Sequence, residues 1–393
     1  MKKVTKILCW FVVLPACTLA QQFERIPIEV MFHGNTKIQF REIATTSKGA
    51  MLITASRNFA EIYGGQFGMD FPTGGLTDNK GNPGKTPRSS ILYDAYYLFT
   101  GFKCIAEGPG DILYIVSDNN NIGWIDYKVG KGISQPPFNF PGNQKIDIRK
   151  IWLDQDGDLF IAASDTIYLI REATKLFKPG SQELNFKGDP KDTSNRVTQG
   201  AKKIEKFTLG KNVFPFCFTS DPFDNTIYIG TNKGIFKFEK KTGSSFNLFG
   251  NKQDQITITD IHVKNLGGYI WFSTMEKGMG SYSIFSKGVD YYPYKIKPVD
   301  KNPVQRFTTL SDKEFLVATG DSLPAIFNIE TYKYEFINDT SFLHSKNNIT
   351  DIKSGAANIT VIIKDGDLYI SHDFLKNRGL KKTYPSEPYL KEI

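Results

Sequence analysis

The 393-residue sequence contains few of the side chains that metal sites, nucleophilic centres and cross-links require, with only four cysteines and four histidines. Cys9 and Cys17 fall in the leader region described below, and the histidines show neither metal-ligand spacing nor a His-Glu-x-x-His motif. No Gly-x-Ser-x-Gly elbow occurs. We therefore expect no catalytic residue, metal or cofactor. Residues remote in the chain can still meet in the folded protein, so an enzyme is disfavoured but remains open.

Cys104 and Cys217 remain after the leader, on the first strands of two repeats that are not neighbours. Such strands should stand farther apart than the roughly 7 Å Cα separation that a disulfide tolerates. We expect two buried free thiols.

Long apolar runs are also missing. The run Ile7 to Leu14 follows Lys2, Lys3 and Lys6 and precedes the small residues before Gln21. It is too short to span a bilayer, which takes about 20 residues. A basic start, a short apolar core and small residues predict a signal peptide over residues 1–20, cleaved after Ala20. The mature protein is then exported to the periplasm or beyond, without a transmembrane segment. The alternative is a lipid anchor on Cys17, since residues 14–17 resemble a lipobox.

The sequence has no dense basic stripe, although its net charge is +8. Three of the excess lysines belong to the leader, and the others are spread along the chain. This pattern does not predict a nucleic-acid partner. It is typical of a solvated surface, and we expect a monomer whose partner is a glycan or a protein.

Helical periodicity is absent, and seven units of strand and turn take its place. Clear copies run from Ile148 to Ile170, from Phe214 to Phe238 and from Ile258 to Phe285. Four of the six spacings between units are about 45 residues, the length of one four-stranded blade. Within each unit the apolar residues alternate with period two. The sequence predicts an all-β fold, a seven-bladed β-propeller. We centre its second strands on Leu52, Tyr114, Phe160, Tyr228, Trp271, Leu316 and Ile362.

One domain over residues 21–375 accommodates these repeats, followed by a tail over 376–393. Residues 64–90 and 177–203 are predicted insertions, because they are rich in Gly, Pro, Lys, Asn or Asp and lack periodic apolar residues. The last unit shows only three strands, whereas residues 26–32 alternate before the first full unit. We expect this N-terminal strand to close the last blade as its outermost strand, where Pro27 is tolerated.

Two motifs resemble ion-binding loops, but each departs from the pattern that such a loop requires. Gly84-Lys85-Thr86 resembles the end of a phosphate-binding loop, but Asn79 stands where that loop needs glycine. Asp154, Asp156 and Asp158 offer oxygen ligands, but Gly157 is out of register for a calcium loop. A hairpin turn explains these aspartates, and a similar Asp-Gly-Asp recurs at Asp365.

The loops between the second and third strands are the candidate binding surface, because a propeller gathers them around its axis on one face. They mix acids, bases and amides that suit a polar ligand. The candidate ligand-binding residues are Arg57, Asn58, Asp118, Asn119, Asn120, Asp165, Asn232, Lys233, Glu276, Lys277, Asp321, Lys364 and Asp365.

Residues 227–243 and 269–283 resemble two-component-regulator propeller repeats. Each has an aromatic or aliphatic pair, Gly-Thr or Ser-Thr, a few polar residues, Gly, and a strand closing on Phe or Tyr. The resemblance covers these two repeats well, residues 148–170 and the last repeat loosely, and the others mainly by spacing. It implies a periplasmic sensor propeller of the kind found in hybrid histidine kinases of Bacteroidota. In that family an immunoglobulin-like domain, a membrane helix and a kinase follow, which these 393 residues do not contain, so signalling is not carried over.

Three functions are compatible with these observations. The leading hypothesis is an exported, non-enzymatic propeller that binds a glycan fragment or a protein through its axial loop face. The second is a lyase or hydrolase with a site in the central channel, since residues 118–126 faintly resemble repeats of propeller lyases. The third is a structural surface or assembly protein that docks through its two insertions.

Overall fold

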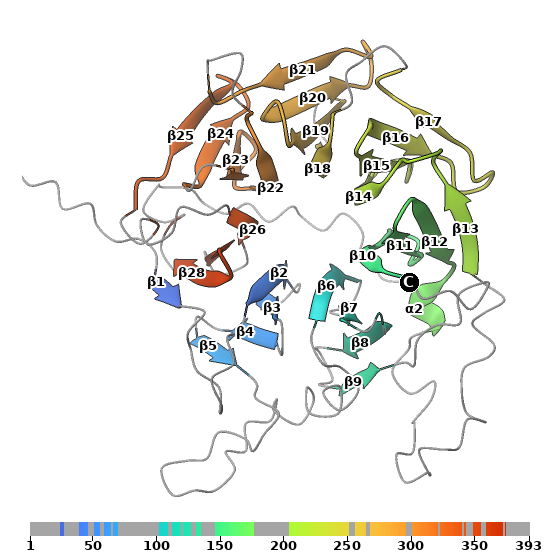
Figure 1. The fold of residues 1–393 in the computed structure, drawn as a ribbon, viewed down its shortest axis with the longest axis horizontal. Helices are drawn as coiled ribbons and strands as arrows, with labels where there is room; N and C mark the ends of the chain where they lie inside the picture. The colour runs from blue at the N-terminus through green and yellow to red at the C-terminus, as the bar shows by residue number, and fades with distance from the viewer. Residues whose placement is uncertain are drawn as a thin grey trace, which may run out of the picture.

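The computed structural model describes residues 24–26, 39–45, 51–55, 59–63, 66–69, 102–108, 112–118, 120, 122–126, 131–134, 146–176, 204–250, 256–264, 268–295, 301–320, 323–339, 342, 349–354, 359–371 and 374. Within these residues the chain forms antiparallel sheets of four strands, arranged around a common centre (Figure 1). We number the sheets in chain order by their innermost strands.

The first three sheets have their strands in sequence order. The first contains β2 (Phe40–Thr45), β3 (Met51–Ala55), β4 (Phe59–Tyr63) and β5 (Gln66–Met69). The second contains β6 (Phe102–Glu107), β7 (Ile112–Ser117), β8 (Ile122–Asp126) and β9 (Lys131–Ser134). The third contains β10 (Ile148–Leu153), β11 (Leu159–Ala163), β12 (Thr166–Ile170) and β13 (Ile204–Thr208), with the short helix α2 (Ala173–Leu176) after β12.

The next three sheets repeat this order. The fourth contains β14 (Pro215–Ser220), β15 (Ile227–Thr231), β16 (Gly234–Phe238) and β17 (Ser245–Asn247). The fifth contains β18 (Ile258–Lys264), β19 (Tyr269–Thr274), β20 (Met279–Ser283) and β21 (Val289–Tyr292). The sixth contains β22 (Val304–Thr309), β23 (Glu314–Thr319), β24 (Ala325–Asn328) and β25 (Lys333–Phe336).

The last sheet combines the two ends of the described chain. It contains β26 (Ile349–Ser354), β27 (Thr360–Lys364) and β28 (Asp367–Ser371), and β1 (Glu24–Ile26) pairs antiparallel with β28. The N-terminal strand therefore lies earlier than the predicted 26–32. It ends directly before Pro27, which has no N–H to donate to the ladder; residues 27–38 lie outside the described part.

The core lies between neighbouring sheets, because each sheet buries apolar side chains on both faces. β11 and β12 are buried at every position. Phe160 and Ile167 of the third sheet pack with Phe218 and Phe236 of the fourth. Ile43 of the first sheet packs in the same way with Val361 of the last. Stacking therefore buries surface that a single repeat would expose.

The predicted strand centres are confirmed, because each of the seven lies within the second strand of its sheet. One boundary was wrong: β5 lies inside the predicted insertion 64–90, so Gln66–Met69 form the outer strand of the first sheet. The second predicted insertion, the tail and the predicted signal peptide lie outside the described residues. Where the structure is described, no helix has the length and apolar character needed to cross a membrane.

Candidate functional site

The first strand of every sheet carries a register irregularity near its beginning. In each case the pairing with the second strand shifts between the first residue and the one two or three positions later. A bulge of this kind turns a side chain out of the ladder. The residues directly after the shifts include Lys150, Asp260, Arg306 and Asp351. These innermost strands face the centre of the molecule in Figure 1, so the four charged residues stand on strands next to the axis.

Carboxylates near the axis accept N–H groups of innermost strands. Asp351 Oδ1 accepts the N–H of Ile352 at 2.9 Å, and its Oδ2 accepts the N–H of Ile43 on β2 at 2.7 Å. Asp260 Oδ1 accepts the N–H of Ile261 on its own strand, and its Oδ2 accepts the N–H of Phe307 on β22 at 3.2 Å. These bonds satisfy backbone donors that would otherwise be buried without partners.

Glu42 brings cations to the same centre. Its Oε2 accepts the N–H of Ile105 at 3.1 Å, while Oε1 lies 3.0 Å from Lys150 Nζ. Arg306 Nη2 reaches to 4.0 Å from the same Oε1, and its Nη1 donates to the carbonyl of Thr259. Glu42 and Arg306 belong to the first and sixth sheets, so their contact joins two sheets that are not neighbours. We call Glu42, Lys150, Asp260, Arg306 and Asp351 the axial charge cluster.

Burial changes the proton affinities in this cluster. Burial raises the pKa of Asp351 to about 6, although Arg306 opposes the rise. Burial also lowers the pKa of His262, whose ring lies 4.6 Å from that of Phe307 and whose Nε2 lies 3.9 Å from Asp260 Oδ2. The carboxylate oxygens of Asp351 and Asp260 are already engaged by backbone N–H groups, which indicates a structural role for both.

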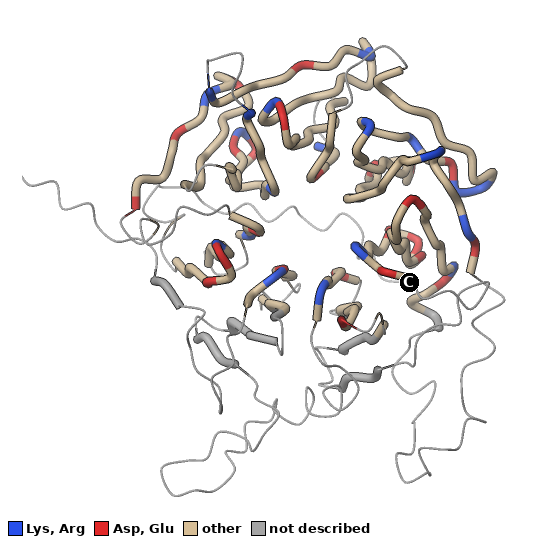
Figure 2. The backbone as a smooth tube through the Cα atoms, in the orientation of Figure 1, with Lys and Arg blue, Asp and Glu red and all other residues tan. Residues whose placement is uncertain are grey.

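The innermost strands β2, β6 and β10 each have a cation as their second residue, Arg41, Lys103 and Arg149, so these cations lie at one mouth of the axis. Figure 2 shows Lys or Arg positions on the strands around the centre. Arg41 pairs with Asp118 on the loop after β7. Lys103 Nζ lies 2.5 Å from Asn120 Oδ1 and 2.8 Å from Asp147 Oδ1. Arg149 is exposed and lies 5.7 Å from the centre of the Phe214 ring. The hydrogen bond from Lys103 and, with it, the charge of Arg149 lower the pKa of Asp147, but Arg149 forms no ion pair within 4 Å in the described part of the chain.

The loops after the second strands lie at this same mouth. The pairing of Ile148 with Ala163 shows that the first strand begins where the second ends. Asn120 accepts the N–H of Ile148 at 2.9 Å, and Asn232 accepts that of Phe214 at 2.7 Å. The structure therefore brings loop residues of neighbouring sheets together with the starts of the innermost strands. We call Arg41, Lys103, Arg149 and these loops the axial mouth.

The other predicted site residues have varied environments. Glu276 accepts the N–H of Thr257 at 3.0 Å, and Lys233 Nζ donates to the carbonyl of Lys211 at 3.1 Å. Lys277 lies 4.8 Å from the Tyr291 ring, and Asp165 accepts from the hydroxyl of Thr166 at 3.3 Å. Asp365 is exposed at a positive φ of 54°. Arg57, Asn58, Asn119 and Asp321 lie outside the described residues.

Lys364 does not belong to this surface. Its side chain is buried, and Nζ donates to the carbonyl of Phe342 at 2.5 Å. A turn of two residues joins β27 to β28, with Lys364 paired to Asp367, and the alternation of the strand turns this lysine inward.

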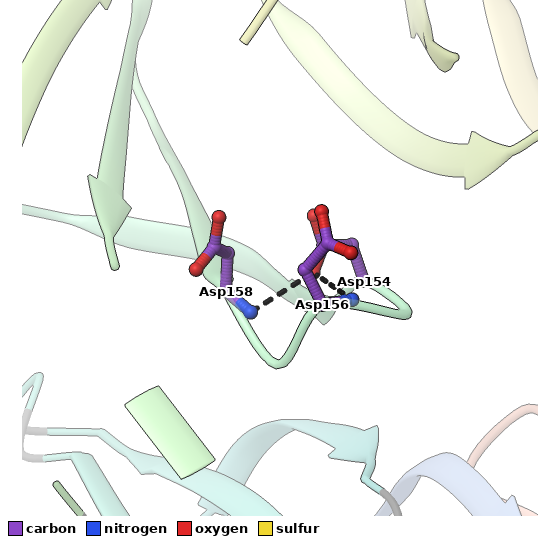
Figure 3. A group of neighbouring side chains, drawn as sticks. All are labelled: Asp154, Asp156 and Asp158. Atoms are coloured by element: carbon purple, nitrogen blue, oxygen red, sulfur yellow. Dashed lines mark hydrogen bonds between the residues drawn. The ribbon is translucent and has the colours of Figure 1, made fainter. Parts of the chain in front are cut away.

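The three aspartates Asp154, Asp156 and Asp158 do gather at one turn, as Figure 3 shows. Asp154 Oδ1 accepts the N–H groups of Asp156 and Asp158, both at 2.9 Å. Lys240 Nζ, from the fourth sheet, lies 2.5 Å from Asp154 Oδ2 and 3.1 Å from Asp158 Oδ2, and it also contacts Asp156. The lysine ammonium therefore occupies the centre that a cation would take. We interpret the group as a link between the third and fourth sheets.

The two later cysteines are buried and free, as expected. Cys104 lies on β6 and Cys217 on β14, and burial raises the pKa of both thiols.

Comparison with known proteins defines the class. No family profile and no curated protein matches the chain. Among solved structures, the extracellular domain of the putative hybrid two-component system BT4673 from B. thetaiotaomicron aligns with a TM-score of 0.59 and 16% identity over 89% of this chain. The corresponding domain of BT3049 from the same organism aligns with a TM-score of 0.59 and 15% identity over 90% of this chain. This chain covers 40% and 42% of those two structures.

A streptogramin B lyase structure aligns with a TM-score of 0.56 and 13% identity, over 88% of this chain and 96% of the lyase. The chain is therefore a β-propeller domain. The resemblance to the extracellular propellers of hybrid two-component systems, expected from residues 227–243 and 269–283, is confirmed at the level of the fold.

Proposed function

We propose that this chain is an exported, non-enzymatic β-propeller that binds a polar ligand, a glycan fragment or a segment of a partner protein, at the axial mouth. Its four-stranded sheets are seven blades of one closed ring, with β1 as the outermost strand of the last blade. Contacts between neighbouring innermost strands support this, including those between β26 and β2. The hydrogen bond from the Phe40 N–H to the Gly366 carbonyl at 3.1 Å joins the same two sheets.

The proposal rests on the exposed polar residues of the axial mouth, which lie next to an axis whose charged residues already contact one another. Lys150 and Arg306 both contact Glu42 near the centre, so these charges partly compensate one another there. Arg149 at the mouth is exposed and has the face of an aromatic ring as its partner. A guanidinium with free N–H donors can bind carboxylate or hydroxyl oxygens of a ligand.

The test uses the chain from residue 21 onward on arrays of defined oligosaccharides and of peptides. We expect binding that falls at least tenfold in the double variant Arg149→Ala, Lys233→Ala. Lys241→Ala removes one exposed charge from the turn between β16 and β17, at the other end of the fourth sheet, and serves as the control. Absence of binding, or equal binding by all three proteins, would overturn the proposal.

An enzyme at the channel is the second candidate, and one observation favours it. His262 and Asp260 lie 3.9 Å apart beside the axis, and Asp351 has a raised pKa. Perturbed titratable groups of this kind occur at catalytic sites. Incubation with a streptogramin B antibiotic, followed by chromatography, tests the activity of the lyase neighbour. Turnover that His262→Ala abolishes would replace the binding proposal, and an unchanged antibiotic would exclude this activity.

A further inference from the structure

A stack of aromatic rings runs from the core between the fifth and sixth sheets to the surface. The buried Trp271 lies 5.9 Å from Tyr292, and Tyr292 lies 4.6 Å from Tyr332 with the rings almost parallel at 3°. Tyr332 is 52% exposed. Tyr269, whose ring lies 6.4 Å from that of Trp271, is also exposed. β21 and β25 lie at the periphery in Figure 1, away from the axial mouth.

Tyr332 adopts a backbone conformation that disfavours a bulky side chain. Its φ is 56°. The corresponding turns of the fourth and fifth sheets place Gly243 and Lys287 at φ of 69° and 57°. In all three turns the N–H of this residue bonds to the carbonyl four residues earlier. Glycine meets this requirement without strain.

The turn accepts a residue other than glycine, since Lys287 adopts the same φ, but it does not require an aromatic ring. Strained residues cluster at sites where the side chain has a function. The ring is the feature that distinguishes Tyr332 from Gly243, and its stacking on Tyr292 fixes the orientation of the ring.

The chemistry of the exposed side chains indicates the ligand. Every large exposed apolar residue in the described part of the chain is aromatic: Phe223, Phe246, Tyr269, Phe285 and Tyr332. A protein-binding surface usually has an extended apolar centre, whereas Tyr332 offers one flat ring between polar residues. Asp290 and Lys333 are exposed on the strands that carry Tyr292 and follow Tyr332.

A sugar ring matches this arrangement. Its C–H face stacks on an aromatic ring, while its hydroxyls need charged or polar partners beside the ring. We propose that Tyr292 and Tyr332, together with Tyr269, form a carbohydrate-binding site separate from the axial mouth. The sugar stacks on the exposed face of Tyr332, and the side chains of Asp290 and Lys333 bond its hydroxyls.

The sharpest test is Tyr332→Gly, because glycine removes the ring and suits the backbone. We expect its melting temperature to stay within about 2 °C of the parent protein. On an array of oligosaccharides built from hexoses, N-acetylhexosamines and uronic acids, we expect its affinity to fall about tenfold. Tyr332→Phe should retain most of the binding. Phe246→Ala, which removes an exposed ring from β17, is the matched control and should bind like the parent.

Several outcomes would overturn this site. The parent protein could bind no oligosaccharide, or Tyr332→Gly could bind as well as Phe246→Ala. A peptide library that selects ligands dependent on Tyr332, without any oligosaccharide, would assign the stack to a protein partner and refute a carbohydrate site. Binding lost in the Arg149, Lys233 double variant but kept in Tyr332→Gly would refute the stack and leave the axial mouth standing.

Discussion

The carboxylate of Asp351 is the most informative group to perturb, because it connects the last sheet to the first. It is 6% exposed, and its two oxygens accept the N–H groups of Ile352 and Ile43 at 2.9 and 2.7 Å. Asp351→Asn keeps the shape and one acceptor oxygen but places an N–H₂ group against one backbone donor. It also removes a negative charge close to Arg306.

The effect of pH separates the charge from the shape. Burial raises the pKa of Asp351 from 3.8 to about 6, which corresponds to about 3 kcal/mol. The folded protein binds this proton more tightly than the unfolded chain does. The contribution of Asp351 to stability therefore increases as the pH falls from above 6 to below 3.8. The asparagine variant lacks this group, so the wild type should gain about 2.4 kcal/mol on the variant between pH 7 and pH 4.

Urea unfolding of the two proteins between pH 4 and pH 7.5 measures this difference. Asp312→Asn, an exposed aspartate on the turn after β22, is the control and should track the wild type within about 0.5 kcal/mol at each pH. A difference for Asp351→Asn that does not change with pH, or that favours the wild type more at pH 7 than at pH 4, would refute the argument.

Three further substitutions probe other parts of the structure. Lys240→Ala removes the ammonium among three carboxylates and should cost about 2–4 kcal/mol in chemical unfolding; an unchanged midpoint would mean that water already screens them. Gly230→Ala places a Cβ 2.4 Å from Cys217 Sγ and should cost about 1–3 kcal/mol, visible as a lower melting temperature. Burial lowers the pKa of Lys364 from 10.5 to about 8. The stability of the wild type should therefore rise as the pH increases between these two values. In thermal unfolding, Lys364→Met should be more stable than the wild type at pH 7, and this advantage should shrink toward pH 10. An advantage that grows with pH would contradict this reasoning.

The repeat strands could be predicted from the sequence because local pattern and tertiary packing agree in them. Trp271 and Ile362 stand within strands that are rich in β-branched and aromatic residues and are buried at almost every position. The edge strands gave weaker signals. β5 has four residues, of which Phe67 and Met69 alternate with Gln66 and Gly68. So short a run, next to a Gly-rich stretch, does not stand out from a loop.

Only part of the candidate site could be predicted from the sequence. Asp118 and Asn120 follow a strand in a polar loop, and turn chemistry alone selects them. Their partners Arg41 and Lys103 were missed, because each stands within a strand. A signal was present: a cation follows the apolar first residue of β2, β6 and β10. The role of such a cation depends on its partner in the neighbouring sheet, which the local sequence does not reveal, since Arg41 and Asp118 lie 77 residues apart in the chain.

The axis of the fold explains why the proposed ligand site lies at a mouth rather than inside the channel. The inner edge of an innermost strand has no further strand to pair with, so its backbone groups need other partners. Asp260 and Asp351 supply acceptors to the next innermost strand. Lys150 and Arg306, which can only donate, neutralise the carboxylates. A ligand within the channel would have to displace these bonds, whereas a ligand at the mouth meets the exposed Arg149 without breaking any of them.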